Sequence, residues 1–186
     1  MNILKKSFLD KFLIKWRTKK VKNLIKGGVV CDLGCGDGEF LLEISKKIKK
    51  GYGFDKKTKS RKIGNILIKK ITKKKIPLKK ECADYVTLIA VIEHLEKPEE
   101  IIMECKRILK KNGLLIITTP LPRSRVVLGI MTKLNLLGWG GEEVKDHKRY
   151  FDNKSMNYLL NKEGFKILKY ETFELGFNSL IMASKK

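Results

Sequence analysis

The segment Val29–Phe40, VVCDLGCGDGEF, constrains the fold more than any other part of the sequence. It places a short apolar run, Val29–Leu33, directly before three glycines at alternate positions, Gly34, Gly36 and Gly38. In parallel α/β sheets, ligands bind where such a buried strand ends and turns into a helix. The segment therefore predicts the first strand of an α/β sheet, followed by a loop whose backbone a ligand can approach closely.

The spacing of the glycines limits which ligand this loop holds. A dinucleotide fingerprint requires G-x-G-x-x-G, but here Glu39 stands at the third glycine position, and no Gly-Lys-Ser/Thr follows as in a P-loop. Asp32 and Asp37 flank the loop, and carboxylates repel phosphate but accept hydrogen bonds from hydroxyl and ammonium groups. Asp55, at the end of the expected second strand GYGFD, is placed to accept from both hydroxyls of a ribose. S-adenosylmethionine carries all of these donor groups.

Strand and helix patterns alternate along the chain, which predicts an α/β fold with a mostly parallel sheet covered on both faces. The expected strands are 29–33, 51–55, 65–68, 84–90, 114–119, 165–173 and 177–184, the last two as an antiparallel edge pair. The expected helices are 7–25, 39–48, 98 to a stop at Gly113, 126–137, and a last one that begins near Asp152, Asn153 or Ser155 and ends by Gly164. Phe8, Phe12 and Trp16, spaced by four, support the first helix, and no linker divides residues 1–186, so we expect one domain.

Composition narrows the cellular context. No apolar run approaches the roughly 18 residues that cross a bilayer, and the N-terminus lacks a cleavage site of the signal-peptide kind, so we expect a cytoplasmic protein. The four cysteines form no CxxC pair, and the chain has only two histidines. We therefore expect free thiols and no metal site.

The net charge of +22 has two explanations that the sequence leaves open. A basic surface can bind RNA or an anionic membrane. However, 36 of the 42 basic residues are lysine, whereas arginine is preferred for phosphate recognition. The sequence also lacks glutamine, and a lysine-rich, glutamine-poor composition is typical of proteins from a thermophile.

Four stretches in order resemble the class I S-adenosylmethionine-dependent methyltransferases, specifically the small-molecule group typified by ubiquinone/menaquinone-biosynthesis enzymes. They are VVCDLGCGDGEF, GYGFD, ADYVTLIAVIEHLEKPEEIIMECKRILKKNGLLIITTP and DHKRYFDNKSMNYLLNKEGF, and they span most of residues 28–170. The resemblance implies a Rossmann-like sheet of seven strands in the order 3-2-1-4-5-7-6, with the last strand antiparallel. It also implies S-adenosylmethionine as cofactor and S-adenosylhomocysteine as product.

The resemblance also implies which residues form the site. Those expected to bind the cofactor are Asp32, Gly34, Cys35, Gly36, Gly38, Asp55, Lys56, Thr72, Ala90 and Glu93. Asp55 would hold the ribose and Lys56 the adenine edge, while Ile92, Glu93 and His94 would follow the fourth strand beside the transferred methyl group. The family often has an acidic segment where this chain has ITKKK (71–75), so the backbone near Thr72 would replace the usual carboxylate.

His94 and His147 are the candidate catalytic residues, because histidine serves as a general base when the acceptor must lose a proton. Each has an ordinary structural alternative, as a helix-start residue for His94 and as part of a salt-bridged loop for His147. Residues 121–150 are expected to cap the acceptor site, and their apolar helix and Trp139 favour a small-molecule or lipid-like acceptor. This region and the basic N-terminal helix (1–26) would also allow weak contact with an anionic membrane.

Two other functions remain open at this stage. RNA methylation fits the charge, but the chain lacks an Asn-Pro-Pro-aromatic element and any cysteine in a Pro-Cys element. A catalytically silent partner protein with the cofactor fold is the other alternative, supported only by the altered ITKKK segment. Neither the acceptor atom nor an oligomeric state follows from the sequence.

Overall fold

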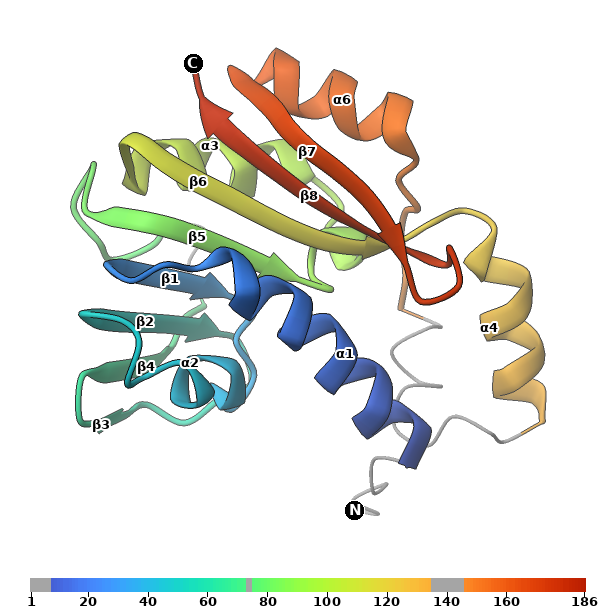
Figure 1. The fold of residues 1–186 in the computed structure, drawn as a ribbon, viewed down its shortest axis with the longest axis horizontal. Coiled ribbons are helices and arrows are strands. Elements are labelled where there is room, and N and C mark those ends of the chain that lie inside the picture. Colours follow the sequence, from blue (N-terminus) through green and yellow to red (C-terminus); the bar gives the residue numbers. More distant parts are fainter. Residues whose placement is uncertain (1–7, 73–74, 135–145) are drawn as a thin grey trace.

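The computed structural model describes residues 8–72, 75–134 and 146–186 as a mixed sheet with helices on both faces (Figure 1). Its strands are β1 (Val29–Leu33), β2 (Lys50–Asp55), β3 (Arg61–Ile63), β4 (Ile66–Lys70), β5 (Ala83–Ile89), β6 (Leu109–Pro120), β7 (Phe165–Phe173) and β8 (Asn178–Lys185). Its helices are α1 (Phe8–Leu24), α2 (Glu39–Glu43), the 3₁₀ helix η1 (Ile92–His94), α3 (Pro98–Ile108), α4 (Ser124–Lys133) and α6 (Asn153–Lys162).

The strand order across the sheet is β3-β4-β2-β1-β5-β6-β8-β7. The strands from β4 to β6 run parallel, and β8 is antiparallel to both of its neighbours, β6 and β7. The order expected for seven strands is therefore confirmed. Because the parallel strands all end at the same edge, the segments that follow β1, β2, β5 and β6 meet there.

An eighth strand, β3, was not expected from the sequence. It pairs antiparallel with β4 through Ile63 and Ile66, and only Gly64 and Asn65 lie between them. All three residues of β3 are exposed, so no apolar alternation marks the strand. The available signal was the turn itself, since glycine at the first position of a two-residue loop favours a β-hairpin.

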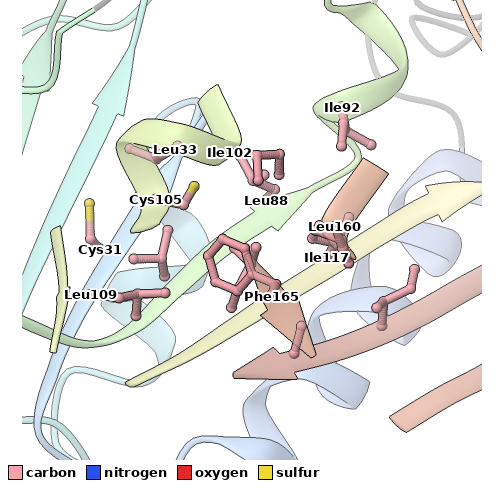
Figure 2. Packing of buried hydrophobic residues seen from close by; sticks show 14 of the residues in the cluster. Cys31, Leu33, Leu88, Ile92, Ile102, Cys105, Leu109, Ile117, Leu160 and Phe165 are labelled. Carbon is pink, nitrogen blue, oxygen red and sulfur yellow. The ribbon is translucent and has the colours of Figure 1, made fainter. Parts of the chain in front are cut away.

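Each face of the sheet buries its own apolar cluster. On one face, α3 and α6 pack over the strands through Ile102, Cys105 and Leu160, among others, and Figure 2 shows this cluster around Phe165. On the other face, α1 and α2 contribute side chains such as Val21 and Leu41. The two clusters confirm that helices cover both faces, as the alternating pattern predicted.

Two helices are shorter than expected because carbonyl groups of the predicted helical segments accept hydrogen bonds from other parts of the chain. The helix predicted over 39–48 ends at Glu43, and the Asn65 amide then donates to the carbonyls of Ser45 and Ile48 at 3.0 and 2.8 Å. The helix predicted to stop at Gly113 ends at Ile108, whose carbonyl accepts from the backbone of Cys82 at 2.9 Å. The segment after α2 thus bonds to the Asn65 side chain in the β3–β4 turn, and the end of α3 bonds to the backbone just before β5, in place of the helical hydrogen bonds that local propensity favours.

The first half of α1 extends past the sheet (Figure 1). Phe8 and Phe12 are 87% and 50% exposed, whereas Val21 near the end of the helix is fully buried. The spacing of the aromatic residues correctly indicated the helix, but only Trp16 packs against the core, and the side chains of Phe8 and Phe12 lie outside it. No helix within the described ranges combines the length and the apolar character needed to cross a bilayer.

Candidate active site

The glycine loop after β1 is fixed by the end of β2. The backbone N–H groups of Gly34 and Cys35 both donate to the Phe54 carbonyl, at 2.7 and 3.2 Å. Gly34, Gly36 and Gly38 all have positive φ values, of 76°, 52° and 76°, which favour glycine. A Cβ atom on Gly34 would overlap Val91 and one on Gly38 would overlap Ile68, whereas a Cβ on Gly36 would meet nothing within 4 Å.

Gly36 therefore marks the open side of the loop, where a ligand can approach the backbone. Beside it, Asp55 ends β2 with its carboxylate held by two backbone donors, Gly36 N–H at 3.0 Å and Lys57 N–H at 2.7 Å. A carboxylate offers about four acceptor positions, so two remain for other donors. An open glycine backbone next to an oriented carboxylate fits the adenosine and methionine parts of S-adenosylmethionine.

Asp32 lies at the base of the loop and is nearly fully buried, at 3% exposure. The Thr87 hydroxyl donates to its Oδ1 at 2.5 Å, but burial dominates and raises the pKa of Asp32 to about 7, with a further contribution from the nearby Asp55 charge. A cationic group bound here would favour the ionised carboxylate. This carboxylate is thus suited to receive an ammonium or hydroxyl donor of the cofactor.

Cys35 lies within the loop and its thiol donates to the Gly36 carbonyl at 3.4 Å. Burial and the nearby Asp32 carboxylate raise the pKa of this thiol well above its usual value. All four cysteines are free, as expected. A thiol with a raised pKa is a poor nucleophile, which argues against a mechanism based on Cys35.

The loop after β2 covers the other side of the glycine loop. Thr58 donates to the Asp37 carboxylate at 3.5 Å, and the Arg61 guanidinium donates to the Asp37 carbonyl. Lys56 is exposed at the start of this loop. Thr72 is exposed too. The Ile71 N–H next to it donates to the Asp55 carbonyl at 2.9 Å, so the start of ITKKK lies beside Asp55. Positions 73 and 74 of ITKKK lie outside the described residues.

The chain turns sharply where β5 ends. Ala90 has a φ of 55°, which is rare for a residue other than glycine, and its N–H donates to both the carbonyl and the hydroxyl of Thr118. Val91 then packs against Gly34. Ile92 enters the core (Figure 2), while Glu93 and His94 follow it in η1. This turn brings η1 next to the glycine loop, as the resemblance implied.

Three potential ligand side chains meet beyond β5. One ligand atom from each of Glu93, His94 and His147 lies within 4.8 Å of the other two. The two imidazole rings are 4.8 Å apart between centroids in an edge-to-face arrangement, and His147 Nδ1 lies 3.1 Å from the Tyr150 hydroxyl. The structure therefore brings together both histidines that the sequence singled out.

Backbone hydrogen bonds hold this cluster in place. The Glu93 carbonyl accepts from Lys148 N–H at 2.8 Å and Arg149 N–H at 3.1 Å, which docks the segment 146–150 on η1. The Glu93 carboxylate is 1% exposed and accepts from the Thr119 hydroxyl at 3.1 Å. The sequence predicted roles for the two histidines separately, and no local pattern in it indicated that they touch.

Burial shapes the protonation of both rings. It lowers the pKa of His147 to about 4, with the neighbouring His94 and Arg17 acting in the same direction. It also lowers the pKa of His94, partly offset by Asp146, whose carboxylate lies 3.8 Å from His94 Nδ1. Both imidazoles are therefore neutral at pH 7.

The described residues of the expected cap, 121–134 and 146–150, include the helix α4, which follows β6 (Figure 1). Val126, Ile130 and Leu134, spaced by four at and just beyond this helix, are 67%, 52% and 63% exposed. Leu137 and Trp139 of the expected cap lie outside the described residues. A separate pocket, lined by Lys50, Asn65 and Ile66 among others, lies at the opposite, amino edge of the sheet and away from this site.

Comparisons with known proteins agree with this geometry. Residues 6–170 match the family model described as a methyltransferase domain. An uncharacterised protein of Methanocaldococcus jannaschii is 29% identical over 174 residues, covering 92% of this chain and 75% of that protein. The ubiquinone/menaquinone biosynthesis C-methyltransferase of Campylobacter jejuni is 22% identical, covering 92% of this chain and 87% of the relative.

Solved structures show the same fold. The methyltransferase in a Haloferax volcanii complex with the Trm112 activator superposes with a TM-score of 0.74 at 14% identity, over 95% of this chain and 93% of that one. An S-adenosylmethionine-dependent methyltransferase of Thermotoga maritima has a TM-score of 0.69 at 26% identity, over 95% and 90% of the two chains. With the cofactor cradle described above, these matches favour an enzyme over a catalytically silent partner protein. The chain belongs to the methyltransferase-domain family and is a class I S-adenosylmethionine-dependent methyltransferase.

Proposed function

We propose that this enzyme methylates a small-molecule or lipid-like acceptor that binds between the glycine loop, the histidine pair and α4. The observation that carries the proposal is the stripe formed by Val126, Ile130 and Leu134, which exposes apolar surface next to the carboxyl edge of the sheet. Residues four apart lie on one face of a helix, so the stripe offers one continuous contact to an apolar chain. A polar acceptor such as RNA would gain nothing from this surface.

The residues of the site divide into two groups by what they would hold. Asp55 and the open backbone at Gly36 would bind the cofactor, which when bound supplies an electrophilic methyl group. His94 and His147 are proposed to contact the acceptor, and Val91 separates them from the glycine loop. Their neutral rings can accept a hydrogen bond or a proton from it. Methyl transfer is an in-line displacement at the methyl carbon. Most of the rate enhancement would therefore come from the alignment of acceptor and cofactor.

The charge around the apolar stripe suggests where a lipid-like acceptor is met. Arg125 and Lys133 are exposed on α4, and Lys11 and Lys15 are exposed on α1 near Phe12. A surface that combines exposed apolar side chains with lysine and arginine binds anionic membranes. We propose weak contact of this kind through α1 and α4.

A transfer assay tests the acceptor class. The enzyme would be incubated with methyl-labelled S-adenosylmethionine and three acceptors: a phenol with a long isoprenoid chain in micelles, the same phenol without the chain, and bulk RNA over a salt series. We expect label in the long-chain product above the other two. Label that enters RNA and persists as salt rises would contradict the proposal, since nonspecific RNA binding weakens steeply with salt.

Paired variants locate the contact. Ile130→Ser should raise KM for the long-chain acceptor by about five- to tenfold, because it removes most of one buried aliphatic contact, while S-adenosylmethionine affinity stays unchanged. Met103→Ser on α3 is the matched control, since Met103 is 51% exposed and Ile130 is 52% exposed. If both substitutions raised KM equally, α4 would not be part of the acceptor site.

A further inference from the structure

We propose that Glu93, His94 and His147 form a binding site for one divalent transition-metal ion. The site goes beyond the proposed function and is tested separately from it. The three ligand atoms already lie within 4.8 Å of one another, although Glu93 and His147 come from opposite ends of the segment that contains β6 and α4. In a tetrahedral zinc site, bonds of about 2.1 Å place ligand atoms roughly 3.4 Å apart. Side-chain rotations that move the ligand atoms by about 1 Å would therefore bring them to the distances of a bound ion.

The surroundings of each ligand match those of metal sites in proteins. Metal-binding histidines use one ring nitrogen for the ion and the other for a second partner that orients the ring. His147 Nδ1 lies 3.1 Å from the Tyr150 hydroxyl, and His94 Nδ1 lies at ion-pair distance, 3.8 Å, from the Asp146 carboxylate. We therefore assign Nε2 of each ring to the ion. The Thr119 hydroxyl orients the Glu93 carboxylate in the same way.

The backbone makes the arrangement specific. Glu93 O accepts from both Lys148 and Arg149, so the segment that carries His147 is fixed directly to the residue that supplies the carboxylate. The Asp146 carboxylate opposes the positive charge that Arg17 places near His147. A docked pair of histidines beside a buried carboxylate is preorganised for a cation, which is the main requirement for tight binding.

The donor set determines the class of ion. Two imidazole nitrogens and one carboxylate oxygen suit Zn²⁺, Co²⁺, Fe²⁺ or Mn²⁺, whereas Mg²⁺ and Ca²⁺ prefer an all-oxygen shell. Three protein ligands leave at least one position of the ion open. Since η1 packs next to the glycine loop through Val91, that position would face the acceptor. An oxygen or nitrogen donor of the acceptor would then complete the shell of the ion, in place of the direct contacts with His94 and His147 proposed above for the enzyme without the ion. This step rests on the proposed function, but binding of the ion does not.

The chain offers a direct readout, because His94 and His147 are its only histidines. Untagged protein would be freed of metal with EDTA and titrated with ZnCl₂ by calorimetry, while proton NMR follows the two imidazoles. We expect one ion per chain and shifts of both histidine signals at the same equivalence point. CoCl₂ should give the absorption of nitrogen- and oxygen-ligated Co²⁺ without a thiolate charge-transfer band, and excess Mg²⁺ should not compete.

Variants make the test decisive. His94→Gln, His147→Gln and Glu93→Gln should each weaken Zn²⁺ binding by more than about tenfold, since each removes one of three ligands and even outer partners contribute roughly 10- to 100-fold. Cys82→Ser, which removes a free thiol just before β5, is the control that should bind as the parent does. Two unchanged histidine signals at saturating Zn²⁺, or full binding by the double variant without histidines, would overturn the site.

The two proposals fail separately. If a glutamine variant does not fold by circular dichroism, the NMR titration of the unaltered protein still decides the question. If the protein does not bind Zn²⁺ but binds S-adenosylmethionine and methylates the long-chain phenol, the metal site alone is rejected. Zn²⁺ binding to both histidines without transfer to any apolar acceptor would reject the acceptor class alone.

Discussion

The backbone N–H of Gly36 donates to Oδ2 of Asp55 at 3.0 Å, so the loop after β1 and the end of β2 form one unit. The residue with the open Cα thus lies beside the carboxylate with spare acceptor positions. Neither feature alone would indicate adenosine. We propose that together they shape the cofactor site and set its donor preference, so substitutions in this unit should change cofactor binding before they change the fold.

Replacement of Asp55 by alanine should weaken S-adenosylmethionine binding by about 10- to 100-fold, because hydrogen bonds to a charged group contribute about 1.5–3 kcal/mol. Isothermal titration calorimetry measures the change. Asp37→Ala removes the same charge from the neighbouring loop, but the Asp37 carboxylate accepts only a long hydrogen bond of 3.5 Å from Thr58. This control should change affinity by less than about threefold. Equal losses in both variants would mean that net charge, not the ribose contact, sets the affinity.

Gly36→Ala should abolish most cofactor binding, while it lowers the free energy of unfolding only modestly. Its Cβ has free space, and its φ of 52° imposes a cost of about 1–2 kcal/mol on a side chain. Gly64→Ala is an unusually close control, since Gly64 has a φ of 55° and equally free space but lies in the β3–β4 turn. Urea unfolding should show similar losses for both variants, and calorimetry should show loss of binding only for Gly36→Ala.

Asp32→Asn should change how stability depends on pH. The pKa of Asp32 is about 7 in the folded chain and near its usual value of 3.8 in the unfolded chain, so the unfolded chain releases this proton first. Stability from this group is therefore complete below pH 3.8 and is lost as pH rises through 7, by at most about 4 kcal/mol. An asparagine side chain does not titrate, so the variant would not show the loss. Unfolding free energies of the two proteins should thus diverge in favour of the variant between about pH 4 and pH 7, and parallel curves would contradict the assignment.

Arg107→Lys should destabilise the fold by about 2 kcal/mol, because lysine cannot reproduce a forked set of hydrogen bonds. The Arg107 guanidinium donates to Glu104 and to the carbonyls of Ile76 and Leu78, at 2.7–2.9 Å, which fixes the segment before β5 to α3. Arg125→Lys on the exposed face of α4 should stay within about 0.5 kcal/mol. Guanidinium-chloride unfolding of the three proteins measures both effects.

The cradle was predictable because its signals are local. Three glycines with required backbone conformations, a strand before them and Asp55 at the end of the next strand all lie within one βαβ unit. The strand order also follows, since connection rules leave few arrangements for such a pattern. The start of α6 is likewise a local signal: of the three starts that the sequence offered, Asp152, Asn153 and Ser155, the structure has Asp152 as N-cap, with Ser155 completing a capping box.

The rest depends on contacts between distant segments. Where α2 and α3 end early, the Asn65 side chain and the Cys82 backbone donate to carbonyls of the predicted helical segments, and helix propensity carries no information about such partners. The exposure of Phe8 follows from the length of α1 relative to the sheet, which periodicity does not report. The contact between His94 and His147 depends on the docking of 146–150, and no sequence spacing encodes it.

The hydrogen bonds to the Glu93 carbonyl can form only late during synthesis of the chain. Its two partners, Lys148 and Arg149, leave the ribosome only after the whole of β6 and α4. A nascent chain that ends before residue 147 already contains Gly36 and Asp55, but lacks His147. Under the proposed function, the residues for the methyl donor are therefore synthesised well before the second half of the acceptor site.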